Sequence, residues 1–256
     1  MWDRRQYQKF STERARPFFD LLGQVQRDSV AVAVDLGCGT GELTRALAER
    51  WPQARVTGLD NSPQMLEKAA RSEIPGRLSF VIGDIATWKA AEPCDLIFSN
   101  AALHWVGDHS GLLKSLAGML APDGTLAVQM PSRFQTPSQR AIEETVNGPR
   151  WQRLRGVGLH ADSVRPLPWY VEQLHDLGFT VNAWETTYVH VLTGENPVLE
   201  WLKGTGLRPL LARLDPADTD DFLSELGARL RAAYPPTGSH TLFPFPRIFF
   251  VATRAT

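Results

Sequence analysis

The sequence predicts an α/β fold in which helices cover a doubly wound, mainly parallel sheet. Apolar runs of strand length alternate with helical patterns from residue 30 to residue 131, and this alternation is typical of parallel sheets with right-handed crossovers. The first run, residues 30–41, reads VAVAVDLGCGTG, a buried strand that ends in an acid and three glycines. A strand, a glycine-rich turn and a helix amino terminus are where this fold binds a nucleotide-like ligand.

The other elements follow in chain order. A helix around residues 18–25 precedes the first strand, and another at 42–51 follows the glycines. Between the glycines and residue 131 we expect strands at 55–59, 78–82, 95–99 and 125–130, and helices at 63–69 and 109–120. Residues 131–165 lack a clean periodicity and are expected to form a loop. After them we expect a helix at 169–177, one or two strands at 179–192, two amphipathic helices between 197 and 234, and a last strand at 248–252.

The length of 256 residues suits one domain with a full core. We expect a single domain over residues 1–256. Its parts would be an N-terminal lid and helix at 1–28, a cofactor-binding core at 29–131, and a helical cap at 193–240 inserted before the last strand.

Charge and composition argue against several classes of partner. The net charge is −1, with 27 Lys and Arg against 28 Asp and Glu, so we expect neither nucleic acid nor a membrane as a partner. No apolar stretch has the length of a signal peptide or a span, which favours the cytoplasm. The 2 cysteines and 6 histidines show no metal-ligand spacing, so no metal site is expected. A monomer or weak homo-oligomer is the expected assembly.

The spacing of the glycines narrows the class of ligand that this turn can bind. Dinucleotide-binding turns carry G-x-G-x-x-G, whereas Gly37, Gly39 and Gly41 form G-x-G-x-G. Asp35, two residues before the first glycine, would repel a pyrophosphate and attract an ammonium group. Taken alone, the turn could also belong to a phosphate-binding or non-catalytic α/β domain.

The run D-L-G-C-G-T-G resembles the first motif of class I S-adenosylmethionine (SAM) dependent methyltransferases. This resemblance implies a seven-stranded, Rossmann-like methyltransferase sheet, and SAM as cofactor, with S-adenosylhomocysteine as product. Polar residues at four strand ends would meet the cofactor, since ligands lie at the carboxyl edge of such sheets. Asp60 could accept from both ribose hydroxyls. The resemblance also places Asp84 and Ile85 at the adenine and Asn100 at the methionine end. The full expected cofactor set is Tyr7, Asp35, Gly37, Gly39, Asp60, Asn61, Asp84, Ile85 and Asn100.

Further motifs resemble the trans-aconitate 2-methyltransferase family nearly end to end. They are SxERxRP at 11–17, DLIFSNAALHWV at 95–106, LAVQMP at 126–131, TTYVH at 186–190, WLKGTGLRP at 201–209 and FPRIFFVA at 245–252. The resemblance implies transfer of a methyl group to a carboxylate of trans-aconitate, a small polycarboxylate, as a monomethyl ester. Residues 131–165 match least.

The implied chemistry needs few catalytic groups. A carboxylate has a pKa of about 4 and is already ionised at neutral pH, so it attacks the sulfonium methyl without a general base. We therefore assign no catalytic residue and expect catalysis by positioning. Charge is lost in the transition state, because the carboxylate and the sulfonium neutralise each other. A cation bound to the reacting carboxylate would therefore favour the ground state and slow the step. Arginines should instead hold the two carboxylates that do not react. The expected substrate set is Arg14, His104, Trp105, Tyr188, Arg208 and Arg247.

Two alternatives stay open. One keeps SAM but methylates carbon or nitrogen of another small molecule, with His104 as the base that such an acceptor would need. The other is a SAM-binding protein without turnover, which the arginine-bearing cap disfavours.

Overall fold

The computed structural model describes residues 15–132, 136–157, 163–204 and 206–254. The chain forms two compact units. Unit 1 contains the described residues up to Pro131, together with Arg165–Glu185 and the segment from Ile248 onward. Unit 2 contains the described residues of Ser132–Val164 and Thr186–Arg247.

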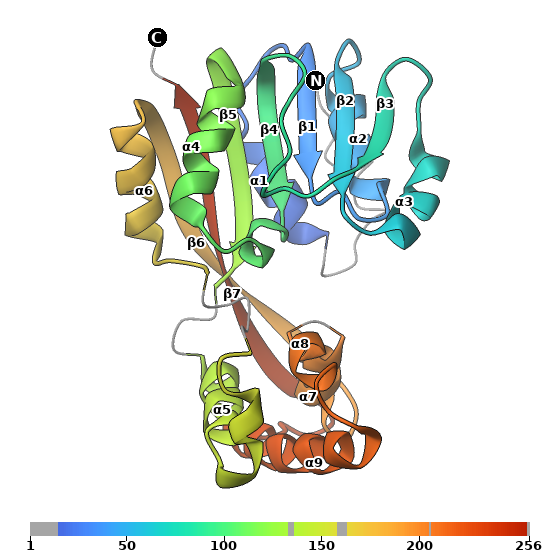
Figure 1. Cartoon of the computed structure of the whole chain (residues 1–256), viewed down its shortest axis with the longest axis vertical. Helices are drawn as coiled ribbons and strands as arrows, with labels where there is room; N and C mark the ends of the chain where they lie inside the picture. Colours follow the sequence, from blue (N-terminus) through green and yellow to red (C-terminus); the bar gives the residue numbers. More distant parts are fainter. Residues whose placement is uncertain (1–14, 133–135, 158–162, 205, 255–256) are drawn as a thin grey trace. The chain divides into compact units, whose positions relative to one another are not determined.

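Seven strands form one sheet in the order β3-β2-β1-β4-β5-β7-β6. Strands β1 to β5 pair in parallel wherever they are neighbours, and β7 runs in the opposite direction to β1 (Figure 1). This confirms the predicted mainly parallel, doubly wound α/β class. The strands are β1 Val32–Leu36, β2 Arg55–Asp60, β3 Leu78–Ile82, β4 Cys94–Asn100, β5 Leu120–Pro131, β6 Phe179–Leu192 and β7 Thr241–Arg254.

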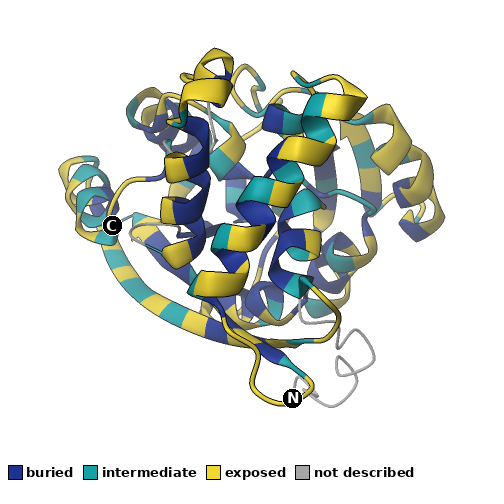
Figure 2. Cartoon of the chain, turned by 90° about the horizontal axis from the view of Figure 1, so that it is seen from below, coloured by how far each residue is buried: buried dark blue, intermediate teal, exposed yellow. Residues whose placement is uncertain are grey.

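The helices of unit 1 pack their apolar sides on the sheet, with α4 and α6 on one face and α1 on the other (Figure 1). Figure 2 shows helices with buried inner and exposed outer faces. Ser62 caps α3 by accepting the Met65 N–H at 3.4 Å, and Asp108 caps α4 by accepting the Gly111 N–H at 3.0 Å. The helical elements of unit 1 are α1 Arg16–Gln24, α2 Glu42–Arg50, α3 Pro63–Ala69, η2 Ala70–Ser72, η3 Leu103–Trp105, α4 His109–Met119 and α6 Leu167–Asp176.

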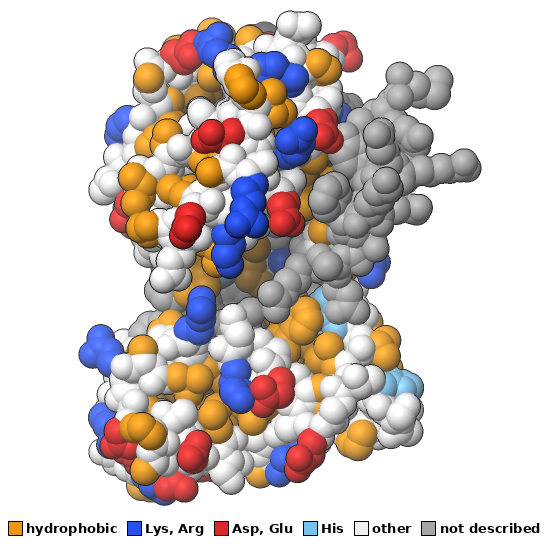
Figure 3. All heavy atoms as spheres, turned by 90° about the vertical axis from the view of Figure 1, so that its right-hand side faces the viewer, with side chains coloured by type: hydrophobic (Ala, Val, Ile, Leu, Met, Phe, Trp, Pro, Cys, Tyr) orange, Lys and Arg blue, Asp and Glu red, His pale blue; other side chains and the backbone are white. Residues whose placement is uncertain are grey.

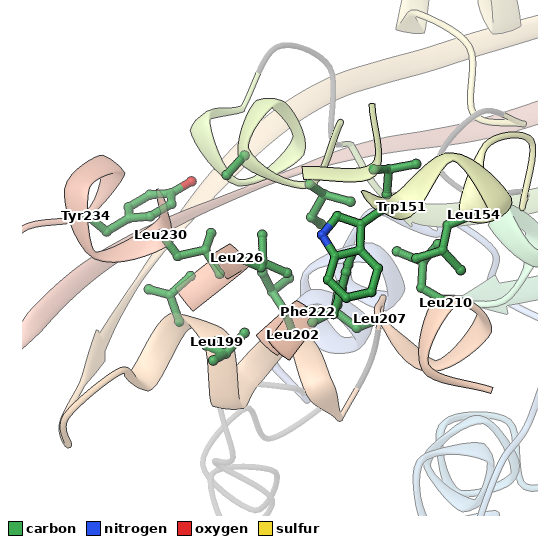
Figure 4. Close-up of a cluster of buried hydrophobic side chains, with 14 of the residues drawn as sticks. Trp151, Leu154, Leu199, Leu202, Leu207, Leu210, Phe222, Leu226, Leu230 and Tyr234 are labelled. Atoms are coloured by element: carbon green, nitrogen blue, oxygen red, sulfur yellow. The ribbon is translucent and has the colours of Figure 1, made fainter. Parts of the chain in front are cut away.

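Unit 2 is mainly helical, and the expectation of a loop at 131–165 is wrong for Pro137–Val146 and Pro149–Leu154, which are helical. Its helical elements are α5 Pro137–Val146, η4 Pro149–Leu154, α7 Pro197–Lys203, α8 Arg208–Leu211 and α9 Pro216–Ala233. They enclose a hydrophobic core in which the Trp151 and Phe222 rings pack edge to face, with centroids 5.2 Å apart (Figure 4). Trp151 Nε1 also donates to Glu225 Oε2 at 2.8 Å. Helices α5 and η4 fold because helix α9 covers their apolar side chains.

Three smaller expectations also need correction. The first of the two helices expected between 197 and 234 is divided into α7 and α8, because α7 ends at Gly204. The strand expected at 125–130 begins earlier, at Leu120, and includes a register shift, where β5 advances from Leu120 to Thr125 while β4 advances from Cys94 to Leu96. Strand β7 begins at Thr241 rather than at residue 248.

Candidate functional site

The turn after β1 is held in a conformation that favours glycine. Gly37, Gly39 and Gly41 have φ values of 82°, 55° and 74°, in the left-handed region where a Cβ is strained. The N–H groups of Gly37 and Cys38 both donate to the Leu59 carbonyl oxygen, at 2.8 and 3.0 Å. The turn is therefore tied to the end of β2.

The three glycines meet different surroundings. A Cβ on Gly37 would lie 2.1 Å from the Ala102 Cβ, and one on Gly41 would lie 2.5 Å from the Phe80 ring. A Cβ on Gly39 would meet no atom within 4 Å. Gly37 and Gly41 thus allow close packing inside the protein, whereas Gly39 faces open space into which a ligand can come against the backbone.

Asp60, at the end of β2, organises the neighbouring backbone. Its Oδ2 accepts the Gly39 N–H and its Oδ1 accepts the Ser62 N–H, both at 2.9 Å. Each carboxylate oxygen has further lone pairs, so both can still accept hydroxyl hydrogens. Asn61 lies next to it and is exposed.

Asp35, at the end of β1, is buried beneath the glycine turn with 3% of its surface exposed. Its Oδ2 accepts the Thr44 hydroxyl at 2.6 Å. Burial raises the pKa of Asp35 from 3.8 to about 7; the Thr44 hydrogen bond opposes the rise and the charge of Asp60 adds to it. Thr44 is not among the residues expected from the sequence, although a polar residue on the inner face of the helix after the glycines is a signal for it.

Asn100, at the end of β4, carries an unsatisfied acceptor. Its side-chain Oδ1 is buried and has no hydrogen-bond partner among the described residues, which is costly unless a ligand supplies a donor. Ala101 follows with a φ of 55°, unusual for a residue with a side chain, and its N–H donates to the Gln129 carbonyl oxygen at 3.0 Å. A strained residue beside an orphaned acceptor marks this position as a candidate ligand contact.

Asp84 and Ile85 follow β3. Asp84 is exposed, and its Oδ1 accepts the Ala86 N–H at 2.9 Å. Ile85 Cδ1 would lie 3.8 Å from a Cβ on Gly37. Ile85 therefore lies against the same glycine turn as Ala102, near enough to line a ligand bound there.

These residues fit a ligand with an amino-acid end and a ribose. Asn100 offers a buried acceptor, Asp35 and Asp60 offer carboxylates, and the backbone at Gly39 is open. All lie at the carboxyl ends of parallel strands. No group of three or more potential metal-ligand residues occurs within the described ranges.

The residues expected to bind the acceptor occur in both units. In unit 1, His104 and Trp105 form the turn η3, their ring centroids are 5.0 Å apart, and Trp105 is 45% exposed. In unit 2, Arg208 begins α8 and is exposed. Tyr7 and Arg14 lie outside the described residues.

Arg247 of unit 2 is buried, with 7% of its surface exposed. Its guanidinium carbon lies 4.9 Å from the ring centroid of Phe245 and 6.0 Å from that of Tyr188. Aromatic faces stabilise a cation with little access to water. A buried arginine in such surroundings can pair with a carboxylate through two parallel hydrogen bonds. The structure thus brings Tyr188 and Arg247 together, while Arg208 makes no ion pair among the described residues.

Residues 33–124 match a family model described as a methyltransferase domain. The protein named trans-aconitate 2-methyltransferase from Streptomyces avermitilis is 50% identical, and the match covers 98% of this chain and 96% of that protein. The proteins with the same name from Streptomyces coelicolor and Azoarcus sp. are 48% and 44% identical; the matches cover 99% of this chain and 86% and 99% of theirs.

Solved structures share the fold at low identity. The YcgJ protein from Bacillus subtilis aligns with a TM-score of 0.61 at 16% identity, over 93% of this chain and 97% of that one. A phosphoethanolamine N-methyltransferase from Haemonchus contortus, described in complex with S-adenosylhomocysteine, aligns with a TM-score of 0.57 at 17% identity, over 94% of this chain and 53% of its own.

Proposed function

We propose the function of this chain from one premise: it belongs to the trans-aconitate 2-methyltransferase family. The chain is a SAM-dependent methyltransferase that transfers a methyl group to a carboxylate of trans-aconitate and forms the monomethyl ester. The observation that carries this assignment is the identity of 43–50% over 98–99% of the chain to proteins of that name.

We assign the cofactor to unit 1. When bound, SAM supplies a methyl group on a positively charged sulfur. Asn100 would accept from the ammonium group of its amino-acid end, Asp35 would stabilise that charge from beneath the turn, and Asp60 would accept from the ribose hydroxyls. Gly39 would let the ligand approach the backbone, and Gly37 would shape the cofactor turn through its close packing on Ala102. Ile85 and Asp84 would lie at the adenine. We propose that Tyr7 and Asn61 complete the cofactor site.

The acceptor is held by arginines and aromatic side chains. Arg247 supports this proposal best, because it is a buried cation packed on aromatic rings. We assign Arg247, Arg208 and Arg14 to the two carboxylates that do not react, and His104, Trp105 and Tyr188 to the walls of the acceptor site. The reacting carboxylate needs no base at neutral pH, so these residues act by orientation and by excluding water.

No helix among the described residues is long and apolar enough to cross a membrane. Figure 3 shows acidic and basic side chains interspersed over the visible face. We propose a small-molecule enzyme of the cytoplasm that binds neither nucleic acid nor membranes and is a monomer or a weak homo-oligomer.

The first experiment is methyl transfer from labelled SAM by the purified protein. We expect base-labile labelling of trans-aconitate that exceeds labelling of cis-aconitate, citrate and isocitrate, because only the correct acceptor places its carboxylate in line with the methyl group. Reactions without an acceptor provide the background. Transfer to none of the four, with SAM still bound in calorimetry, would overturn the substrate assignment.

Arg247→Met should raise the KM for trans-aconitate roughly 10- to 100-fold, because a charge-assisted pair contributes about 1.5–3 kcal/mol. The affinity for SAM should not change. Arg150→Met is the matched control, since Arg150 is an exposed arginine of unit 2 that pairs with Asp218 and Asp221. Equal effects of the two substitutions on KM would contradict the assignment of Arg247.

A further inference from the structure

Two buried side chains of unit 1, His109 and Tyr170, form a hydrogen-bonded pair that the proposed function does not use. His109 Nε2 lies 2.9 Å from the Leu103 carbonyl oxygen, which can only accept, so Nε2 carries the proton. In the neutral imidazole Nδ1 is then the acceptor, and the Tyr170 hydroxyl 2.5 Å away donates to it. The same hydroxyl accepts the Arg165 N–H at 3.1 Å.

The surroundings favour the neutral imidazole. Burial lowers the pKa of His109 below 6.5; the Leu103 and Val106 backbone groups and the Asp108 charge oppose the shift, and the Arg165 charge adds to it. Tyr170 is 1% exposed and its ring stacks on Phe250. The pair thus has one defined tautomer and little freedom to move.

The pair holds one end of the segment between β4 and α4. Leu103 begins the turn η3, which carries His104 and Trp105. The other end of the segment is held separately, by the hydrogen bond from the Ala101 N–H to the Gln129 carbonyl oxygen. Losing the bond to Leu103 would therefore remove one hydrogen bond that fixes the turn, while leaving Asn100 attached to the sheet.

We propose that His109 and Tyr170 are positioning residues, which fix the turn η3 so that His104 and Trp105 are oriented toward the polycarboxylate acceptor. The inference rests on the proposed function, because it presumes that His104 and Trp105 contact the acceptor. It goes beyond the residues expected from the sequence, which include neither His109 nor Tyr170.

Two amide replacements of His109 separate its hydrogen bonds. The nitrogen of Gln can take the place of Nε2 and still donate to Leu103, whereas Asn can reach only the position of Nδ1. We expect His109→Asn to lower kcat/KM for trans-aconitate roughly tenfold or more, since small displacements of positioning groups cost rate. His109→Gln keeps the bond to Leu103 and loses only the bond to Tyr170, so it should lower kcat/KM less, roughly three- to tenfold, as Tyr170→Phe should. The affinity for SAM should change by no more than about twofold in either variant.

Tyr170→Phe removes only the hydroxyl and decides the matter if His109→Asn does not fold. We expect kcat/KM for trans-aconitate to fall roughly three- to tenfold, again with SAM affinity unchanged. The matched control is Ser110→Ala, which removes the other hydrogen bond between α4 and α6, from Ser110 Oγ to Gln173 Oε1 at 3.1 Å. All assays are run well below the melting temperature of each variant.

The outcomes are distinct. A wild type that methylates trans-aconitate, with Tyr170→Phe and Ser110→Ala equally active, would show that the pair is only structural and overturn the inference. If Tyr170→Phe lost both SAM binding and activity, the inference would also be overturned, because the effect would then lie at the cofactor site. A wild type inactive on trans-aconitate would overturn the proposed function, and this inference with it.

Discussion

Asp35 illustrates at the scale of one residue how ligand binding and stability oppose each other. Its carboxyl group lies beneath the glycine turn, where burial raises its pKa from 3.8 to about 7. In the unfolded chain the group ionises near pH 4, whereas in the folded protein it does so near pH 7. Folding therefore takes up a proton between these values, and this group contributes less stability as the pH rises from 4 to 7. A bound ammonium would favour the ionised form and offset the cost.

Asp35→Asn should make the protein without cofactor more stable at pH 8, by up to about 4 kcal/mol, because the amide avoids burying a charge and can still accept from Thr44. The same change should weaken SAM binding roughly tenfold or more. In the wild type, SAM affinity should rise between pH 6 and pH 8. Denaturant unfolding and calorimetry across this range test both effects.

Asp95→Asn is the control, since Asp95 is a carboxylate of unit 1 that accepts the Ala31 and Val32 N–H groups. It should destabilise the protein and leave SAM affinity unchanged. SAM binding that is as tight at pH 6 as at pH 8, or as tight in Asp35→Asn as in the wild type, would contradict the role given to Asp35.

At the scale of elements, the sequence predicts unit 1 far better than unit 2. The strands and helices up to residue 131 have clear apolar periods, and the polar residues at their ends identify the cofactor edge. Helix α5 buries residues at helical spacing, but polar side chains occupy several of those positions, so apolar residues alone mark its period less clearly. Ser138 and Thr145 are buried there, and their hydroxyls are satisfied locally. The Ser138 hydroxyl forms a hydrogen bond with the Thr136 hydroxyl, and the Thr145 hydroxyl donates to the Ala141 carbonyl oxygen.

The same limit applies to the residues expected to bind the acceptor. Burial of Arg247 depends on rings from two strands, Tyr188 of β6 and Phe245 of β7, which are far apart in sequence. A motif search can nominate such an arginine but cannot show that it is buried. The glycines are different, because their backbone conformation is a local property that the spacing already reveals.

At the scale of the whole molecule, the two units are expected to respond differently to the two ligands: SAM should protect unit 1, whereas protection of unit 2 should need the acceptor. Binding slows hydrogen exchange where it adds contacts or suppresses local opening. SAM should slow exchange in peptides around residues 35–41, 58–62 and 100–102 of unit 1. Trans-aconitate, added with S-adenosylhomocysteine, should slow exchange around 186–190 and 243–247 of unit 2.

Arg247→Met should abolish the second effect and preserve the first. Mass spectrometry of exchanged peptides makes the comparison, with the Arg150→Met variant as control. If SAM alone protected the strands of unit 2 as strongly as trans-aconitate does, the division of the two ligands between these residues would be wrong.

Unit 2 is built from two separate stretches of chain, which has a consequence for how this family can diversify. Helix α5 and η4 come from the first stretch, and α7 to α9 come from the second, yet they share one core through Trp151, Phe222 and Tyr234. A recombination event or an engineered chimera that exchanges only one stretch would pair two halves of a core that were never selected together. New acceptor specificity would therefore arise most readily by point substitution within unit 2, or by exchange of both stretches at once.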